Sequence, residues 1–241
     1  MSHKPLTSSH YFFATSPMPC PYLPGRVERR IVTELMGRQA SKFHDHLTLA
    51  GFRRSHSIAY APACPTCQAC IAVRIVTDEF RPSRSQRRIM NINQDLFAAY
   101  RPPEATDEQF DLFTRYQKTR HGTGDMAKMN FSDYQALVEE TPIDTELFEF
   151  TDERGRLTAA CLTDQVTEGL SAVYSFFEPE LKNRSLGSYM ILRLIDEALN
   201  RGLKYVYLGF WVADCAKMSY KAKFQPLEAF IDGSWQIFTP E

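Results

Sequence analysis

The chain has 241 residues, of which 44% are hydrophobic and 24% are charged. This length permits one large domain or two small ones, each with a sizeable core. No apolar run approaches the ~20 residues that span a membrane, and the first residues lack the apolar centre of a signal peptide, so we expect a cytoplasmic protein without a membrane anchor.

The net charge of −1 hides an uneven distribution. Residues 1–120 hold 17 basic and 10 acidic side chains (+7), whereas residues 121–241 hold 11 and 19 (−8). This asymmetry predicts an anionic partner for the N-terminal half, with nucleic acid as the leading candidate. The alternative is that the basic face docks on the acidic half of the same chain.

The N-terminal third is predicted to alternate loops and strands. Residues 1–19 are expected to form a loose arm, and Cys20–Arg26, with two prolines and a glycine, a loop. The predicted strands are Val27–Leu35, Phe52–Tyr60 and Cys70–Val76.

Helices are predicted in the middle of the chain. The basic connector Phe80–Arg88 leads into a helix whose apolar face runs from Ile89 to Tyr100, until two prolines end it. Thr106 and Gln109 have the spacing of a capping box for the next helix. A flexible loop is expected at His121–Gly124, and Ser132 is expected to cap a further short helix.

The C-terminal half is predicted to complete an α+β sheet. An antiparallel meander is expected from the strands Leu147–Thr151, Leu157–Val166 and Leu170–Phe177. A helix follows, with an apolar face from Met190 to Ala198, Ser185 as N-cap and Gly202 as its stop. The buried strand Tyr205–Trp211 comes next.

The start of that last helix has the features of an anion site. A helix N-terminus presents unpaired N–H groups and the positive end of a dipole. With Arg184 beside it and Gly187 allowing close approach, it would suit a phosphate or a carboxylate, as in N-acetyltransferase-like folds. The alternative is an ordinary helix start.

Three cysteines follow a C-x2-C-x2-C spacing at Cys64, Cys67 and Cys70. They share one short loop, and Cys20 or His56 is available as a fourth ligand. Thiolates suit tetrahedral zinc or an iron–sulfur cluster. Reduced thiols without a metal are the alternative, and a disulfide framework is not expected in a cytosolic chain of this size.

Basic side chains occur in three settings. Arg53, Arg54 and Arg74 fall on strand-like segments, where an arginine is either ion-paired or recognises a carboxylate or phosphate through its fork. The connector Phe80–Arg88 contains Arg81, Arg84, Arg87 and Arg88, and the segment after the last predicted strand contains Lys217, Lys221 and Lys223. These side chains are expected to face solvent or phosphate.

Taken together, these segments resemble the arginyl-tRNA–protein transferase family, and most closely its bacterial branch. The resemblance covers nearly the whole chain, from Cys20 to about Phe230. It is carried by Cys20–Arg26, Gly51–His56, the cysteine loop, Phe80–Arg88, Ser171–Phe177, Ser185–Gly187 and Tyr207–Trp211.

The resemblance implies an architecture and an activity. It divides the chain into a Cys-containing N-terminal domain (1–80), a basic helical connector (81–104) and an N-acetyltransferase-like (GNAT-like) domain (105–241), single or doubled. The activity is aminoacyl transfer from aminoacyl-tRNA to proteins that begin with Asp or Glu, which creates a destabilising N-terminus in the N-end rule pathway. The bacterial branch uses leucyl-tRNA and the eukaryotic branch arginyl-tRNA.

This activity assigns expected roles to residues. The acceptor's carboxylate would bind Arg53, Arg54 or Arg74, and Tyr174, Tyr220 and Lys221 are the candidates for catalysis, with no general base identified. The residues expected to bind tRNA are Arg184, Lys217, Lys221, Arg84, Arg87 and Arg88.

No cofactor is expected for the transfer itself, because the ester is already activated. The single Cys20 departs from the paired cysteines of eukaryotic relatives, so the resemblance does not carry a zinc or iron–sulfur site over to this chain. The sequence indicates no oligomeric state. Two other functions stay open: a coenzyme-A-dependent N-acetyltransferase, and a metal-stabilised nucleic-acid-binding module without catalysis.

Overall fold

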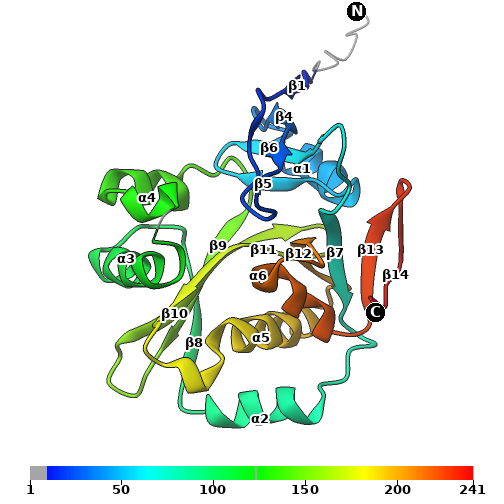
Figure 1. Cartoon of the computed structure of the whole chain (residues 1–241). Coiled ribbons are helices and arrows are strands. Elements are labelled where there is room, and N and C mark those ends of the chain that lie inside the picture. Colours follow the sequence, from blue (N-terminus) through cyan, green and yellow to red (C-terminus); the bar gives the residue numbers. More distant parts are fainter. Residues whose placement is uncertain (1–9, 123, 241) are drawn as a thin grey trace, which may run out of the picture.

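A twisted eight-stranded sheet organises the computed structural model, which describes residues 10–122 and 124–240 (Figure 1). In spatial order its strands are β14 (Ser234–Ile237), β13 (Leu227–Ile231), β7 (Ile71–Val76), β12 (Tyr205–Trp211), β11 (Gly169–Phe177), β10 (Leu157–Val166), β9 (Thr145–Thr151) and β8 (Phe97–Arg101). The predicted α+β class is therefore confirmed.

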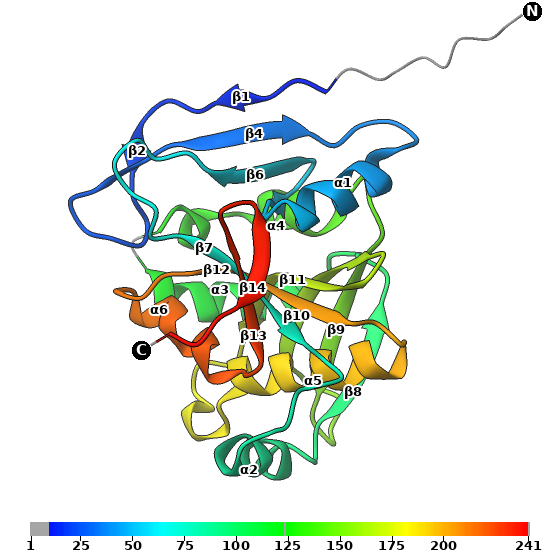
Figure 2. The same cartoon turned by 90° about the vertical axis from the view of Figure 1, so that its right-hand side faces the viewer.

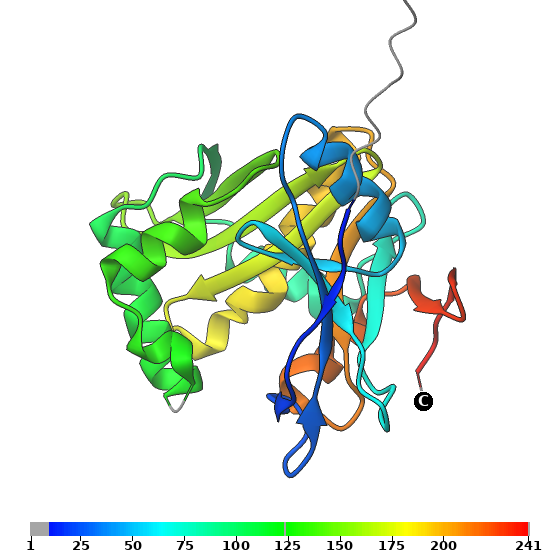
Figure 3. The same cartoon turned by 90° about the horizontal axis from the view of Figure 1, so that it is seen from above.

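A smaller four-stranded sheet lies across the upper end of the large sheet, with its strands crossing those below (Figures 2 and 3). Its spatial order is β1 (Phe13–Ala14), β4 (Arg30–Glu34), β6 (Ile58–Pro62) and β5 (Arg53–Ser55). Beside it, β2 (Met18–Pro19) pairs with β3 (Val27–Glu28). Helix α1 (Ala40–Leu49) packs against this sheet through a cluster that includes Leu35, Leu47 and Ala59.

Helices cover both faces of the large sheet (Figure 1). One face packs on α5 (Leu186–Asn200) and α2 (Arg84–Ile92), and the other on α3 (Asp107–His121) and α4 (Phe131–Glu139). The shorter helical segments are η1 (Asp125–Lys128), η2 (Lys182–Arg184), α6 (Ala216–Ser219) and η3 (Tyr220–Lys223). None of the described helices is both long and apolar enough to cross a membrane.

The alternation of side chains along β10 explains the two cores. Ala159 and Cys161 join the cluster on α5, whereas Ala160 and Leu162 join the cluster on α3 and α4, because successive strand residues point to opposite faces. The predicted apolar stripe of α5, from Met190 to Ala198, is buried in the first cluster and confirms that helix.

The neighbouring parallel strands β11 and β12 pair over only three residues. Gly169 to Ser171 pair with Tyr205 to Tyr207, after which β11 stays with β10 and β12 stays with β7. The register of β12 shifts between Tyr207 and Gly209, and Gly209 has φ +74°. A gap therefore opens between two strands of one sheet, and the backbone groups that line it are left for other partners.

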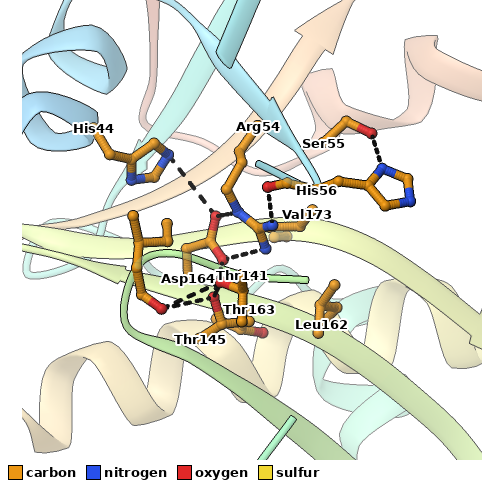
Figure 4. A network of polar contacts seen from close by, with 12 residues as sticks. His44, Arg54, Ser55, His56, Thr141, Thr145, Leu162, Thr163, Asp164 and Val173 are labelled. Atoms are coloured by element: carbon orange, nitrogen blue, oxygen red, sulfur yellow. Dashed lines mark hydrogen bonds and ion pairs between the residues drawn. The ribbon is translucent and has the colours of Figure 1, made fainter. Parts of the chain in front are cut away.

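An ion pair joins the two sheets. Arg54 on β5 donates from Nε and Nη2 to the two carboxylate oxygens of Asp164 on β10, both at 2.7 Å (Figure 4). Thr145 also donates to Asp164, at 2.9 Å. Burial lowers the pKa of the nearby His44 in spite of the carboxylate, so this imidazole is neutral. Arg54 is thus a structural anchor.

Replacing Arg54 with leucine is expected to lower the free energy of unfolding by about 3–5 kcal/mol, since Asp164 becomes a buried charge without its partner. Urea unfolding at pH 7 measures this change. Replacing Asp164 with leucine as well is expected to recover most of the loss, because an apolar pair removes both buried charges. A loss below about 1 kcal/mol in the single variant would contradict the anchoring role.

Most predicted strands and helices are confirmed, including the meander β9–β11, strands β7 and β12, and the capping box of Thr106 and Gln109. The helix expected to reach Tyr100 is wrong. It ends at Ile92, and Phe97–Arg101 instead forms the edge strand β8 beside β9. Asn93 ends the helix because its side-chain amide donates back to the Ile89 carbonyl and across to the Arg184 carbonyl.

Four further local predictions need correction. Phe52–Tyr60 is a hairpin, β5–β6, with His56 at φ 52° in its turn. The expected loose arm contains β1 and β2, and its residues 1–9 lie outside the described part. Asn130, not Ser132, caps α4, because its side chain accepts from the Asp133 N–H. Ser185 stands at the start of α5 in a left-handed conformation without a side-chain capping bond.

The structure tests the expected loop at residues 121–124 only in part, and it does not test the predicted domain division. Of the expected loop at His121–Gly124, His121 is the last residue of α3 and residue 123 lies outside the described part. The division at residues 80 and 104, and a doubled C-terminal domain, stay predictions. Strand β7, from the first 80 residues, lies between β13 and β12 of the large sheet.

Candidate active site in the gap between two strands

The gap between β11 and β12 is occupied by the guanidinium of Arg53. Its Nη2 donates to the Ala172 carbonyl at 2.6 Å and to the Val173 carbonyl at 3.3 Å, both on the unpaired part of β11. Its Nη1 is buried and has no hydrogen-bond partner among the described residues. A charged donor that is held on one side and unsatisfied on the other is suited to bind an oxygen of a ligand.

Gly209 makes room for this guanidinium. An ideal Cβ at that position would lie 2.5 Å from Arg53 Cζ. A glycine inside a predicted strand is a signal of close approach by another group, so this contact could have been anticipated from the sequence.

Lys221 lies on the other strand's side of the gap. Its Nζ donates to the Phe210 carbonyl of β12 at 2.6 Å and lies 3.3 Å from Met218 Sδ. Burial, with the Arg53 charge as the next cause, lowers the pKa of this amine to about 7. The neutral form of Lys221 is therefore accessible near pH 7, which suits proton transfer.

Three tyrosines stand around the same gap. Tyr174 accepts a hydrogen bond from Gln117 Nε2 on α3, so its own hydroxyl proton is free to be donated elsewhere. Burial raises the pKa of Tyr174 and of Tyr116, and raises that of Tyr220 to about 12. These phenols are thus neutral donors at pH 7. Gln117 was not predicted, because a polar residue in the middle of a helix carries no sequence signal.

The end of α3 meets α6 beside these tyrosines. Lys217 Nζ lies 3.2 Å from His121 Nδ1, and the His121 ring packs edge-on against Tyr116 at 5.6 Å. Burial, Lys217 and Arg120 lower the pKa of His121, so its neutral ring can accept from the lysine. Lys217 is exposed.

Two of the arginines predicted to bind the acceptor are fully engaged within the protein. Arg54 is held by Asp164, as described above. Arg74 is buried, pairs with Glu228 at 2.7 Å, donates to the Tyr207 hydroxyl and stacks on Tyr205. Of the three, Arg53 alone has a buried side-chain nitrogen without a hydrogen-bond partner within the described structure.

The residues expected to bind phosphate differ in their exposure. Lys221 is buried, as described above, and does not face solvent, whereas Lys217 is exposed. Arg184 is locked by Asp95, Asn93 and the Ile92 carbonyl, so its guanidinium fixes the end of α2 to the start of α5. In contrast, Arg84, Arg87 and Arg88 on α2 are exposed and make no ion pair with described residues.

The basic helix lies beside the segment that holds Lys221. Gln86 of α2 donates to the Lys223 carbonyl at 3.0 Å, and Phe80 stacks on Phe224 with ring centres 6.4 Å apart. Arg84, Arg87 and Arg88 face solvent on α2, and Lys223 of the adjacent η3 is also exposed.

The four N-terminal cysteines come together around one cavity, between the small sheet and β12. Cys20 Sγ accepts from the Leu23 N–H and Cys64 Sγ from the Arg29 N–H, both at 3.4 Å. Burial, followed by the three other cysteines, raises the pKa of Cys70 to about 12.

The zinc or iron–sulfur site expected at these thiols stays a prediction. Within residues 10–122 and 124–240, no three side chains of His, Cys, Asp or Glu converge closely enough to hold a metal ion.

Comparison with known families gives two matches that together span most of the chain. The model described as "Arginine-tRNA-protein transferase, N terminus" matches residues 18–88. The model described as "Arginine-tRNA-protein transferase, C terminus" matches residues 108–231, which include the gap, Lys221 and Gln117.

Curated relatives are similar over most of their length. A protein of Paramagnetospirillum magneticum named aspartate/glutamate leucyltransferase is 56% identical over 100% of this chain and 98% of its own. Proteins of the same name from Granulibacter bethesdensis and Rhodospirillum rubrum are each 52% identical, over 98% and 99% of this chain and 88% and 97% of their own. Among solved structures, L-PGS from Bacillus licheniformis has a TM-score of 0.49 at 12% identity, over 75% of this chain and 52% of that one, too low to support an argument.

Proposed function

Because the chain belongs to the arginine-tRNA-protein transferase family, we propose that it transfers leucine from leucyl-tRNA to proteins that begin with aspartate or glutamate. The name shared by the full-length relatives supports leucine as the donor and acidic residues as the acceptor. The observation that carries the chemistry is the gap between β11 and β12, where Arg53 presents an unpartnered nitrogen near the buried amine of Lys221.

The reaction is the aminolysis of an ester. The α-amine of the acceptor attacks the carbonyl carbon of the leucyl ester, the new C–N bond forms, and the bond to the ribose oxygen of the tRNA breaks. In this proposal Arg53 Nη1 would donate to the carbonyl oxygen as it becomes negative, which is the part of the transition state where a fixed donor contributes most.

One proton has to leave the attacking nitrogen and one has to reach the ribose oxygen. An α-amino group has a pKa of ~7.7–8, close to that of Lys221, at about 7. Neutral Lys221 can therefore accept the proton of the acceptor and return it to the leaving oxygen. The Tyr174 hydroxyl, oriented by Gln117, supplies a second donor in the gap.

The tRNA would lie along α2, η3 and α6. The exposed cations there are Arg84, Arg87, Arg88, Lys223 and Lys217, and phosphate contacts of this kind position a nucleic acid without reading its sequence. This use of tRNA also favours the cytoplasm as the place of action.

The proposal is tested with leucine and arginine, each radiolabelled on its tRNA, and peptides that begin with Asp, Glu, Lys or Ala. Transfer of leucine to the Asp and Glu peptides only is expected. Transfer of arginine instead would identify arginyl-tRNA as the donor and leave the proposed aminoacyl transfer unchanged. If the folded protein transferred neither amino acid, acetyl-CoA turnover and RNA binding would decide between the two other functions considered from the sequence.

Removing positive charge from α2 is expected to weaken tRNA binding and its salt dependence. In the variant Arg84→Ala/Arg88→Ala, the slope of log Kd against log salt should fall by about 0.7–0.9 for each phosphate that the protein no longer neutralises. Filter binding of uncharged tRNA over a range of salt concentrations, from about 50 to 200 mM, measures the slope. The control Arg154→Ala, in the exposed β9–β10 turn, should leave the slope unchanged. An unaltered slope in the double variant would remove α2 from the tRNA surface.

The transfer is proposed to need no cofactor. A zinc or iron–sulfur group at Cys20, Cys64, Cys67 and Cys70 stays a prediction from the sequence, and elemental analysis of anaerobically purified protein decides it.

A further inference from the structure

The acidic side chain of the acceptor still lacks a binding residue. Arg54 and Arg74 are paired inside the protein, and Arg53 lies in the gap, where it faces the ester. Another cation near the gap is therefore required if acidic acceptors are selected by charge.

The cavity around the cysteines shares a wall with the active site. Phe210, whose carbonyl accepts from Lys221, lines it, and so do Tyr22, Tyr60, Glu28 and Arg30. The Tyr60 and Phe210 rings meet edge-on, with centres 6.1 Å apart. The enclosed cavity has a volume of only about 20 Å³, so an acceptor chain would lie at its mouth, and only the side chain of its first residue would reach the wall that carries Arg30.

The strand register places Arg30 on the same face of the small sheet as Arg53. Tyr60 on β6 is paired with Arg53 on β5, and Pro62, two residues further along β6, is paired with Arg30 on β4. Because residues two apart on a strand share a face, Arg30, Tyr60 and Arg53 all lie on the face turned towards β12.

Arg30 is held in place and has one edge open. Its Nε and Nη2 donate to the Glu28 carboxylate at 3.3 and 2.6 Å, and its guanidinium lies 4.9 Å from the centre of the Tyr60 ring. Nη1 makes no hydrogen bond within the described structure, and the side chain is 32% exposed. Glu28 is only 9% exposed, so the group that fixes Arg30 is itself buried.

The charge of the cavity wall favours an anion. Three arginines, Arg26, Arg29 and Arg30, line the cavity, against the single carboxylate of Glu28. A planar guanidinium with a free edge matches a carboxylate better than a lysine would, because two N–H groups can point at its two oxygens.

We propose that Arg30 binds the side-chain carboxylate of the acceptor's first residue, while Glu28 and Tyr60 hold its guanidinium in position. This inference rests on the proposed function and adds the residue that selects acidic acceptors. In this assignment Arg53 binds the ester and Arg30 binds the acceptor. Loss of Arg53 should therefore lower kcat, whereas loss of Arg30 should raise the KM for the acceptor.

The test compares peptides that begin with Asp and with Asn, which have the same shape but differ in charge. In Arg30→Ala, the KM for the Asp peptide should rise at least about tenfold, and the preference in kcat/KM for Asp over Asn should fall by a similar factor. Binding of leucyl-tRNA should stay at the wild-type level. Arg38→Ala, which removes an exposed charge from the loop after β4, is the matched control.

The variant Arg30→Lys serves as a second test if the alanine variant does not fold. Lysine keeps the positive charge but lacks the paired N–H groups of the guanidinium. The preference of this variant for Asp over Asn should fall by several-fold. An unchanged preference in a folded Arg30 variant that still transfers leucine would overturn the assignment to Arg30 and leave the proposed function standing. A wild-type protein that transfers no leucine would overturn the proposed function itself.

Discussion

Replacing Lys221 with methionine is expected to lower kcat for leucine transfer by about 100-fold or more and, at the same time, to stabilise the protein. The loss of rate follows from removing the proposed proton acceptor, since general acid–base groups contribute about 10²–10⁴. Single-turnover transfer from preformed leucyl-tRNA measures the chemical step.

The gain in stability follows from the sign of the pKa shift. The pKa of Lys221 falls from 10.5 to about 7 on folding, so between these values the unfolded chain binds a proton that the folded chain does not. Wild-type stability therefore rises with pH across this window and carries the full penalty below pH 7, at most about 5 kcal/mol.

The methionine variant has no such penalty. At pH 6 its free energy of unfolding should exceed the wild-type value by roughly 2–4 kcal/mol, after allowing about 1–3 kcal/mol for the hydrogen bond to Phe210 that the variant cannot make. The difference should shrink towards pH 10. Lys42→Met, on the exposed face of α1, is the control and should change neither rate nor stability. A variant that is less stable than wild type at pH 6, or equally fast, would speak against a buried amine in catalysis.

Replacing Gly209 with alanine is the second change with a large expected effect, although glycine carries no chemistry of its own. The new methyl group would lie 2.5 Å from Arg53 Cζ, so the guanidinium has to leave the gap. Nη2 then loses the Ala172 carbonyl, and Nη1 no longer points at the ester. We expect kcat to fall by about 10²–10³, the range for loss of a fixed donor to a developing oxyanion.

Two comparisons separate this effect from backbone strain. Gly37→Ala also forces alanine to a positive φ, +76°, but its Cβ meets nothing within 4 Å, so it should lose only stability, about 1–3 kcal/mol. Combining Gly209→Ala with Arg53→Gln should cost little more than either change, because both remove the same donor. Additive losses would show that Gly209 acts in another way.

Elements with strong periodicity could be predicted from the sequence, whereas those set by tertiary pairing could not. The apolar stripe of α5 and the meander β9–β11 were recognisable because local pattern and final environment agree. The apolar residues of Phe97–Arg101 also fit a helical spacing, which explains the wrong prediction there. Only the pairing of this segment with β9 makes it a strand.

The sequence indicated which types of residue form the site, but not which of the arginines pair with carboxylates inside the protein. An arginine on a strand either pairs internally or binds a ligand, and sequence alone does not separate these. Asp164 and Glu228, which commit Arg54 and Arg74, lie 110 and 154 residues away in the chain. Arg30 was not predicted, because its open edge becomes apparent only when the fold brings Glu28 and Tyr60 against its guanidinium.

The position of β7 limits how the chain can be divided. This strand belongs to the segment that matches the family's N-terminal model, yet it pairs with β12 on one side and β13 on the other. A fragment starting at residue 105 would leave both neighbours as open edges that invite aggregation. We therefore expect the two halves to be soluble only when produced together, and an N-terminal half exchanged between relatives to work only where its β7 fits the recipient's β12 and β13. In this sense the two halves form one working unit, because the shorter half completes both the large sheet and the active site of the longer one.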